Sequence, residues 1–320
     1  MRIKNDYLKY LRYTKSTFWS NYLLEKGVPV SDFYYLKKGN TVHIRSIDHS
    51  FSPGDYPVFF DGYNKYCWKF IENGFRFVFT ENDLFIEIGD LKIKIDTVQE
   101  LYIINEVFLE NTYKIESSSD YVVFDIGMNV GITSLYLSSL KNIKDIYGFE
   151  PFKPTFDCAT ANVGYNTRHM SKIHLNNFGL SNVNSFINLG YDPKNKGNLG
   201  VKTVGVVEND GKNVEQIELR KASECLRPLV DKHSTDRFII KLDCEGSEYD
   251  IIENLDQELM LEKFDVFMIE WHKMEGYKTR LDTLISLLKK SGFVVFATGS
   301  FDHEIGMIYA LNNHSLQREQ

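Results

Sequence analysis

Several acidic residues and glycines occur where predicted strands pass into predicted helices, the position at which parallel α/β sheets bind nucleotides. The segment Asp125–Gly131 reads DIGMNVG and follows the apolar run YVVF. Gly127 and Gly131 let the backbone pass close to a ligand, and the next helix N-terminus offers N–H groups to an anion such as a carboxylate. The strict G-x-G-x-x-G fingerprint of dinucleotide sites is absent. The turn alone therefore indicates a nucleoside-type cofactor without naming it.

A second acidic residue ends the next predicted strand. Glu150 follows DIYGF about twenty residues after the glycine turn and precedes Pro151. A carboxylate at this place can accept hydrogen bonds from both hydroxyls of a ribose, whereas a lone glutamate there would more simply be solvated. Coupled to the glycine turn, the ribose interpretation is favoured. The predicted cofactor-binding residues in these two segments are Asp125, Gly127, Asn129, Gly131, Glu150 and Pro151.

Two later segments carry further side chains that could do chemistry. The run FIIKLDCEGSE places Asp243 at a strand end, and Glu245 and Glu248 at the start of the next helix, where carboxylates are favoured by the helix dipole. The run DVFMIEWH ends in Glu270 and His272. The glycine turn, Phe149-Glu150-Pro151, FIIKLDCEGSE and Ile269-Glu270-Trp271-His272 together resemble the FkbM family of methyltransferases. That family's motifs read close to D-x-G-A-N-x-G, F-E-P, F-I-K-x-D-x-E-G-x-E and I-E-x-H in the same order.

The resemblance covers about residues 100 to 311 and implies S-adenosylmethionine as the cofactor. It also implies an α/β fold, the Rossmann-like seven-stranded sheet of class I methyltransferases, whose last antiparallel hairpin would be FVVFA and GMIYALN. Asn177 or Phe178, after KIHLN, would lie near the adenine, and Asp243 would lie near the cofactor's methyl group. Met128 replaces the family's usual alanine, and we expect it to tighten the turn.

Methyl transfer to an oxygen requires an aligned nucleophile and removal of its proton. We predict Asp243, Glu270 and His272 as catalytic residues, with His272 as general base because an ordinary imidazole titrates near neutral pH. An isolated histidine is also commonly structural. In a second mechanism Asp243 and Glu270 hold Mg²⁺, which lowers the pKa of the substrate hydroxyl. The sequence shows no third ligand at a fixed spacing, so Mg²⁺ is not favoured and no metal site is predicted.

The elements that must position these residues follow from the apolar periodicity. From residue 98 onward, apolar strands alternate with helices, which predicts a mainly parallel sheet covered on both faces. Residues 1–97 form a predicted β-rich aromatic module of unassigned role, with a hairpin of LFIEI and LKIKI around Gly89-Asp90. Residues 98–320 form the predicted cofactor domain. Residues 185–213, rich in Asn, Gly and Lys, are predicted to form a flexible loop or a hairpin over the active site.

Composition limits the partners. The net charge of -7 and the absence of a basic block argue against nucleic acid and favour a small-molecule or glycan acceptor. The four cysteines form no C-x-x-C pair and no apolar run reaches about 20 residues, so a cytoplasmic protein without a transmembrane segment is expected. The first helix carries Arg2, Lys4 and Lys9. It could touch an anionic membrane surface, although a cap helix with a solvated basic face is the preferred interpretation. Oligomeric state is not predicted.

These inferences combine into a single expectation. The chain should be an S-adenosylmethionine-dependent O-methyltransferase that modifies a hydroxyl of a glycan or glycosylated metabolite. One alternative, a nicotinamide-dependent oxidoreductase, requires a tighter glycine fingerprint and a second catalytic domain. The other, a non-catalytic module that keeps the fold, would lack Asp125, Glu150 or Asp243, and all three are present. The aromatic cluster from Phe51 to Trp68 could stack on sugar faces, although core packing is commoner.

Overall fold

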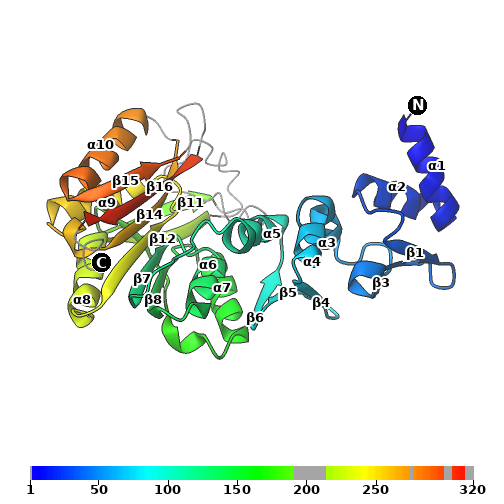
Figure 1. The fold of residues 1–320 in the computed structure, drawn as a ribbon, viewed down its shortest axis with the longest axis horizontal. Helices are drawn as coiled ribbons and strands as arrows, with labels where there is room; N and C mark the ends of the chain where they lie inside the picture. Colours follow the sequence, from blue (N-terminus) through cyan, green and yellow to red (C-terminus); the bar gives the residue numbers. More distant parts are fainter. Residues whose placement is uncertain (1, 191–213, 274–276, 299–304, 314–320) are drawn as a thin grey trace. The chain divides into compact units, whose positions relative to one another are not determined.

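The chain divides into two compact units, Met1–Glu110 and Asn111–Gln320, in a computed structural model (Figure 1). The structure describes residues 2–190, 214–273, 277–298 and 305–313. Each unit has its own sheets and helices. Every predicted site residue belongs to the second unit.

The N-terminal unit contains two three-stranded antiparallel sheets, β1-β2-β3 and β4-β5-β6. The predicted hairpin around Gly89 is confirmed as the β5–β6 pair. Its helices are α1 (Arg2–Thr14), α2 (Thr17–Glu25), α3 (Pro57–Gly62), α4 (Trp68–Glu72) and α5 (Val98–Ile104), with π-helical turns at Tyr63–Cys67 and Asn105–Leu109 and a 3-10 turn at Arg45–Ile47. Its strands are β1 (Phe33–Leu36), β2 (Thr41–Ile44), β3 (His49–Phe51), β4 (Arg76–Phe79), β5 (Leu84–Ile88) and β6 (Leu91–Ile95).

Most of the aromatic cluster forms the core of this unit. Phe51, Phe59, Phe60, Tyr63 and Tyr66 are all buried, and their rings contact one another or neighbouring rings. These five side chains are therefore occupied by packing and present no open platform for sugar rings.

The boundary between the units falls between Glu110 and Asn111, not between residues 97 and 98 as predicted. The reason is the packing of α5, which begins with a capping box of Thr97 and Glu100 and lies against α3. A side chain at Gly62 would meet Leu101 at 2.3 Å, so the missing Cβ lets the two helices approach closely. Helix α5 thus belongs to the core of the N-terminal unit.

The second unit is built on a seven-stranded sheet of order β15-β16-β14-β13-β7-β8-β9. Strand β16 pairs antiparallel with both β14 and β15, and the other pairs are parallel, which confirms the predicted class I methyltransferase sheet. The strands of this sheet are β7 (Tyr121–Ile126), β8 (Ile143–Phe149), β9 (Ile173–Asn176), β13 (Arg237–Leu242), β14 (Val266–His272), β15 (Phe293–Ala297) and β16 (Ile305–Asn312).

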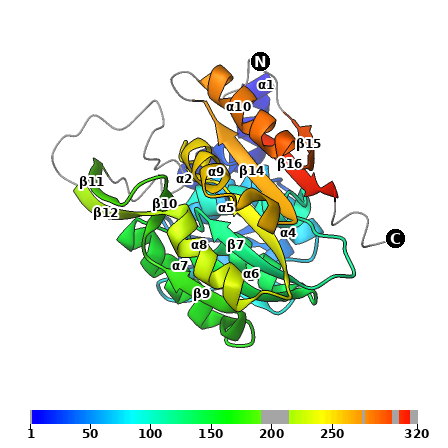
Figure 2. The same ribbon diagram turned by 90° about the vertical axis from the view of Figure 1, so that its left-hand side faces the viewer.

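Helices cover this sheet (Figure 2). Strand β7 is buried at every position, as expected for a central strand covered on both faces. Leu226 of α8, Ile252 of α9 and Leu284 of α10 share one core with the sheet. Helix α6 packs against β8 and α7. The helices are α6 (Ile132–Ser139), α7 (Lys153–Tyr165), α8 (Ala222–Lys232), α9 (Glu248–Gln257) and α10 (Tyr277–Lys290), with 3-10 turns at Met170–Lys172 and Leu261–Lys263.

The second unit also contains a small three-stranded sheet of order β10-β12-β11. Its strands are β10 (Gly179–Ser181), β11 (Ser185–Gly190) and β12 (Val214–Lys221). Of the loop or hairpin predicted at 185–213, residues 185–190 follow the hairpin alternative, because they pair antiparallel with β12. Residues 191–213 of that prediction lie outside the described residues.

The first helix forms where the sequence predicts it. Tyr10 of α1 donates a hydrogen bond to the carbonyl oxygen of Val28 at 2.7 Å, which ties α1 to its own unit. Within the described ranges, no helix is long and apolar enough to span a membrane.

Candidate active site

The glycine turn between β7 and α6 is in direct contact with the end of β13. Gly127, Asn129 and Gly131 all have positive φ, at 78°, 54° and 82°. A Cβ on Gly127 would lie 1.7 Å from the carbonyl oxygen of Asp243, so glycine is required both by conformation and by space. The turn and the Asp243 segment therefore form one wall.

Met128 points away from the pocket wall. Its side chain is buried against Gly148 of β8, where an added Cβ would meet the Met128 sulfur at 2.3 Å. The absence of a side chain at Gly148 thus makes room for a residue larger than the alanine of the resembled motif. Met128 therefore tightens the packing between the turn and β8.

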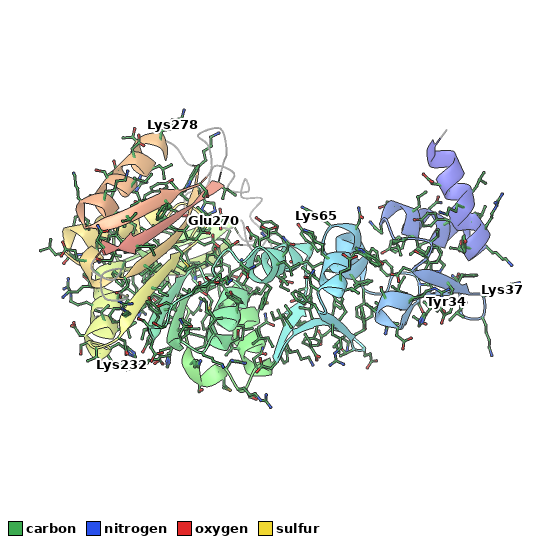
Figure 3. All side chains as sticks on the ribbon, in the orientation of Figure 1. Tyr34, Lys37, Lys65, Lys232, Glu270 and Lys278 are labelled. Carbon is green, nitrogen blue, oxygen red and sulfur yellow. The ribbon has the colours of Figure 1, made fainter. Side chains whose placement is uncertain are left out.

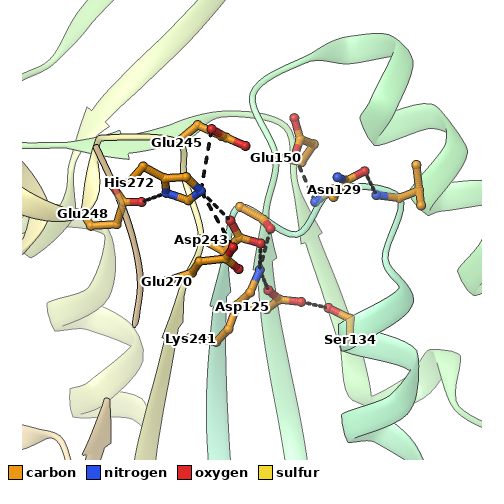
Figure 4. Close-up of polar contacts among 12 residues, drawn as sticks. Asp125, Asn129, Ser134, Glu150, Lys241, Asp243, Glu245, Glu248, Glu270 and His272 are labelled. Atoms are coloured by element: carbon orange, nitrogen blue, oxygen red, sulfur yellow. Dashed lines mark hydrogen bonds and ion pairs between the residues drawn. The ribbon is translucent and has the colours of Figure 1, made fainter. Parts of the chain in front are cut away.

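Asp125 supports the turn from inside the protein. It is fully buried; Ser134 Oγ donates to its Oδ2 at 2.6 Å, and Lys241 Nζ lies 3.1 Å from its Oδ1 (Figure 4). Lys241 is itself buried and also donates to the Gly127 carbonyl oxygen at 2.7 Å. Burial opposes the charge of this lysine, but Asp125 and Asp243 outweigh that effect and raise its pKa. Lys241 therefore keeps its charge inside the protein, next to Asp125.

Glu150 lies at the end of β8 with both carboxylate oxygens held. Oε2 accepts from the Asn129 N–H and Oε1 from the Phe152 N–H, each at 3.0 Å. Burial raises the pKa of Glu150 to about 7, although the two N–H groups act in the opposite direction. Asn177 donates to the carbonyl oxygens of Glu150 and Pro151 at 2.9 and 3.2 Å, so it supports this segment from behind.

These strand ends enclose a pocket. Of the predicted residues, Gly127, Asn129, Glu150, Pro151 and Asp243 line it, whereas Asp125, Gly131 and Asn177 do not. Sequence reasoning did not assign its apolar side. The additional lining residues include Phe149, Phe152, Leu180, Leu219, Cys244, Glu245 and Ser247. Leu219 comes from β12 of the small sheet, and the alternating segment VEQIELRK was the available sequence signal.

The three predicted catalytic residues converge at the ends of β13 and β14. The Nε2 atom of His272 lies 3.9 Å from both Asp243 Oδ1 and Glu270 Oε1 (Figure 4). Glu270 is labelled near the carboxyl ends of the strands in Figure 3, at the opposite end of the sheet from Lys232. The sequence therefore identified side chains that the fold brings together.

Two carboxylates that had no assigned role complete this cluster. Glu248, fully buried at the start of α9, accepts a hydrogen bond from His272 Nδ1 at 2.5 Å, and Glu245 Oε2 lies 3.7 Å from Nε2. Burial alone would lower the pKa of His272, but Glu248, Glu245 and Asp243 raise it to about 10. The only sequence signal for Glu245 and Glu248 was their spacing of three residues at the start of the predicted helix.

The residues that form this site lie within a segment that matches a known protein family. Residues 125–295, more than half of the chain, match the methyltransferase FkbM domain. The chain belongs to the FkbM methyltransferase family. The match begins at Asp125 of the glycine turn and includes the strand ends that carry Glu150, Asp243 and Glu270.

Individual relatives of this FkbM-family chain are distant. It is 24% identical over 226 residues to the methyltransferase sdnD of Sordaria araneosa, which covers 62% of this chain and 84% of that protein. It is 26% identical over 228 residues to the AMB antimetabolite synthetase AmbE of Pseudomonas aeruginosa, which covers 61% of this chain but only 10% of AmbE. A solved structure, methyltransferase FkbM from Methylobacillus flagellatus, matches with a TM-score of 0.41 and 15% identity over 66% of this chain and 50% of that chain.

Proposed function

We propose that this chain is an S-adenosylmethionine-dependent O-methyltransferase that acts on a hydroxyl of a glycan or glycosylated metabolite. One observation carries the proposal: a single pocket joins the buried carboxylate of Glu150 to Asp243, which belongs to the acidic cluster with His272. A nucleoside-binding group and a proton-handling group thus border the same space.

The pocket offers a partner for each part of the cofactor. Glu150 can accept hydrogen bonds from the ribose hydroxyls with the lone pairs that its two N–H donors leave available. The turn at Gly127 and Asn129 would hold the amino-acid end beside the start of α6. Phe152, Leu180 and Leu219 supply an apolar wall suited to a purine face. The bound cofactor would supply a methyl group activated by a positively charged sulfur.

The acceptor hydroxyl must lose its proton as its oxygen attacks. Asp243, Glu270 and His272 are the groups proposed to face that hydroxyl. His272 carries a proton at neutral pH because its pKa is raised to about 10. We therefore assign the handling of the proton to the cluster as a whole and not to His272 alone.

The acceptor class rests on charge. A net charge of -7 and four carboxylates around His272 would repel a polyphosphate and tolerate a neutral sugar. All four cysteines are free, which is compatible with the reducing cytoplasm proposed as the site of the reaction.

The proposal is tested by transfer of a labelled methyl group from S-adenosylmethionine. The acceptor panel should contain glycosides, their single-deoxy analogues, amino-sugar analogues and a structured RNA. Label on a glycoside hydroxyl, lost in one deoxy analogue and lost in Asp243→Asn, is the expected result. Label on the amine or the RNA alone would contradict the acceptor class, and hydride exchange with a nicotinamide would support the oxidoreductase instead.

A further inference from the structure

Three ligand atoms of the catalytic cluster lie at the spacing of a metal site. One atom each from Asp243, Glu270 and His272 lie within 4.8 Å of one another. The distances of 3.9 Å from His272 Nε2 to Asp243 and Glu270 are too long for hydrogen bonds. They suit atoms that share an ion, because ligands each roughly 2.0–2.6 Å from a cation lie about 3–4 Å apart.

The orientation of His272 is an independent sign of a ligand. Its side chain is 5% exposed, its Nδ1 is engaged by the fully buried Glu248, and its Nε2 faces the carboxylates. Across the described part of the chain, Nε2 has no hydrogen bond, only ion-pair contacts of 3.7 to 3.9 Å. A carboxylate on one imidazole nitrogen with the other nitrogen directed at oxygen ligands is the usual arrangement around protein-bound metals.

The charge of the site points the same way. Asp243, Glu245, Glu248 and Glu270 surround the imidazole. Lys241 is 3.6 Å from Asp243 but also neutralises Asp125 at 3.1 Å. A divalent cation among Asp243, Glu270 and His272 would be attracted by the negative charge of these carboxylates.

We propose that Asp243, Glu270 and His272 bind a divalent cation, with Glu248 orienting the imidazole and the Nε2 proton of His272 released to solvent as the cation binds. His272 is the third ligand that the sequence pattern lacked. Two carboxylates and one imidazole favour a cation that accepts both oxygen and nitrogen, such as Mn²⁺, over Mg²⁺ or Ca²⁺.

The role of this cation rests on the proposed function. An acceptor hydroxyl that binds the cation becomes more acidic and passes its proton to the Glu245 carboxylate, which lines the same pocket. The hydroxyl oxygen then forms a bond to the methyl carbon as the carbon–sulfur bond breaks. The electron pair of that bond stays on sulfur and leaves S-adenosylhomocysteine.

The test is a titration of the metal-free full chain with Mn²⁺, followed by loss of the free-ion paramagnetic resonance signal. One Mn²⁺ site per chain is expected. The Mn²⁺ affinity should fall at least about tenfold in His272→Gln and in the less buried Glu270→Gln. It should fall about tenfold in Glu248→Gln. His174→Gln is the matched control, because His174 also pairs with a carboxylate, Asp145 at 2.6 Å, away from the site. Circular dichroism melting identifies any variant that is unfolded.

Absence of a stoichiometric site, or binding unchanged in both folded His272→Gln and Glu270→Gln, would overturn the proposal. A parallel titration with S-adenosylhomocysteine separates the two claims. If that compound binds and Mn²⁺ does not, the metal site is wrong and the proposed function stands. If Mn²⁺ binds as expected and that compound does not, the site stands and its assigned role is wrong.

Discussion

At the scale of residues, Glu150 combines burial with the ribose-binding role that we propose for it. Its carboxylate is buried and its pKa is raised to about 7, so lowering the pH through 7 adds a proton to it. The protonated group is a poorer acceptor for ribose hydroxyls than the carboxylate. Burial of Glu150 should therefore make ligand binding depend on pH near neutrality.

The affinity for S-adenosylhomocysteine should fall about tenfold between pH 8 and pH 6, because the ionised fraction of Glu150 falls by that factor. Calorimetric titration at several pH values measures this. Glu150→Gln should bind more weakly at pH 8 and show a flat profile. A flat profile in the wild-type protein would contradict the assigned role of Glu150.

Lys241 gives a second prediction at this scale. Lys241→Met leaves the fully buried Asp125 carboxylate with Ser134 but without its cation, so the free energy of unfolding should fall by about 3–5 kcal/mol. The double variant Lys241→Met/Asp125→Asn should recover part of that loss. Urea denaturation provides the measurement, with the exposed Lys232→Met as the control that should change little. If Lys241→Met and Lys232→Met lower the free energy of unfolding equally, the ion pair between Lys241 and Asp125 does not stabilise the fold.

At the scale of elements, the turn and the strand behind it are fitted to each other. Gly148→Ala would force its Cβ against the Met128 sulfur, and overpacking of this kind costs about 1–3 kcal/mol of unfolding free energy. Adding Met128→Ala should restore stability in the double variant. Gly164→Ala in α7, where nothing lies within 4 Å of the new Cβ, should be neutral or slightly stabilising. Failure of the double variant to recover would show that the two positions are not coupled.

The elements also show how far the sequence could be interpreted. Buried runs such as YVVFDI and FIIKLD predicted the central strands, because a strand covered on both faces is apolar throughout. Strand β11 is as long as these central strands but partly exposed, so its apolar pattern was weak. The contact between Glu248 and His272 joins residues 24 apart that meet only when α9 folds against β14. Residue spacing predicted the strand-end carboxylates but could not predict this pairing.

At the scale of the whole molecule, the chain is two units, and all residues lining the cofactor pocket belong to the second. A fragment of residues 111–320 should bind S-adenosylhomocysteine as the full chain does. A fragment of residues 98–320 would expose Leu101, Ile104 and Val107, which are buried in the intact chain, and should aggregate more readily. Calorimetry and light scattering on the two fragments measure this. If the fragment of residues 98–320 aggregates less than the fragment of residues 111–320, the boundary at Glu110 is contradicted.

The most direct test of the central claim, that this pocket holds S-adenosylmethionine, is calorimetric titration of the full chain with S-adenosylhomocysteine, NAD⁺ and NADH. Binding of S-adenosylhomocysteine alone, with one site per chain and a strong loss of affinity in Glu150→Ala, is the predicted result. If the folded protein does not bind S-adenosylhomocysteine, or binds a nicotinamide cofactor in its place, the account of this site as a methyltransferase pocket is contradicted.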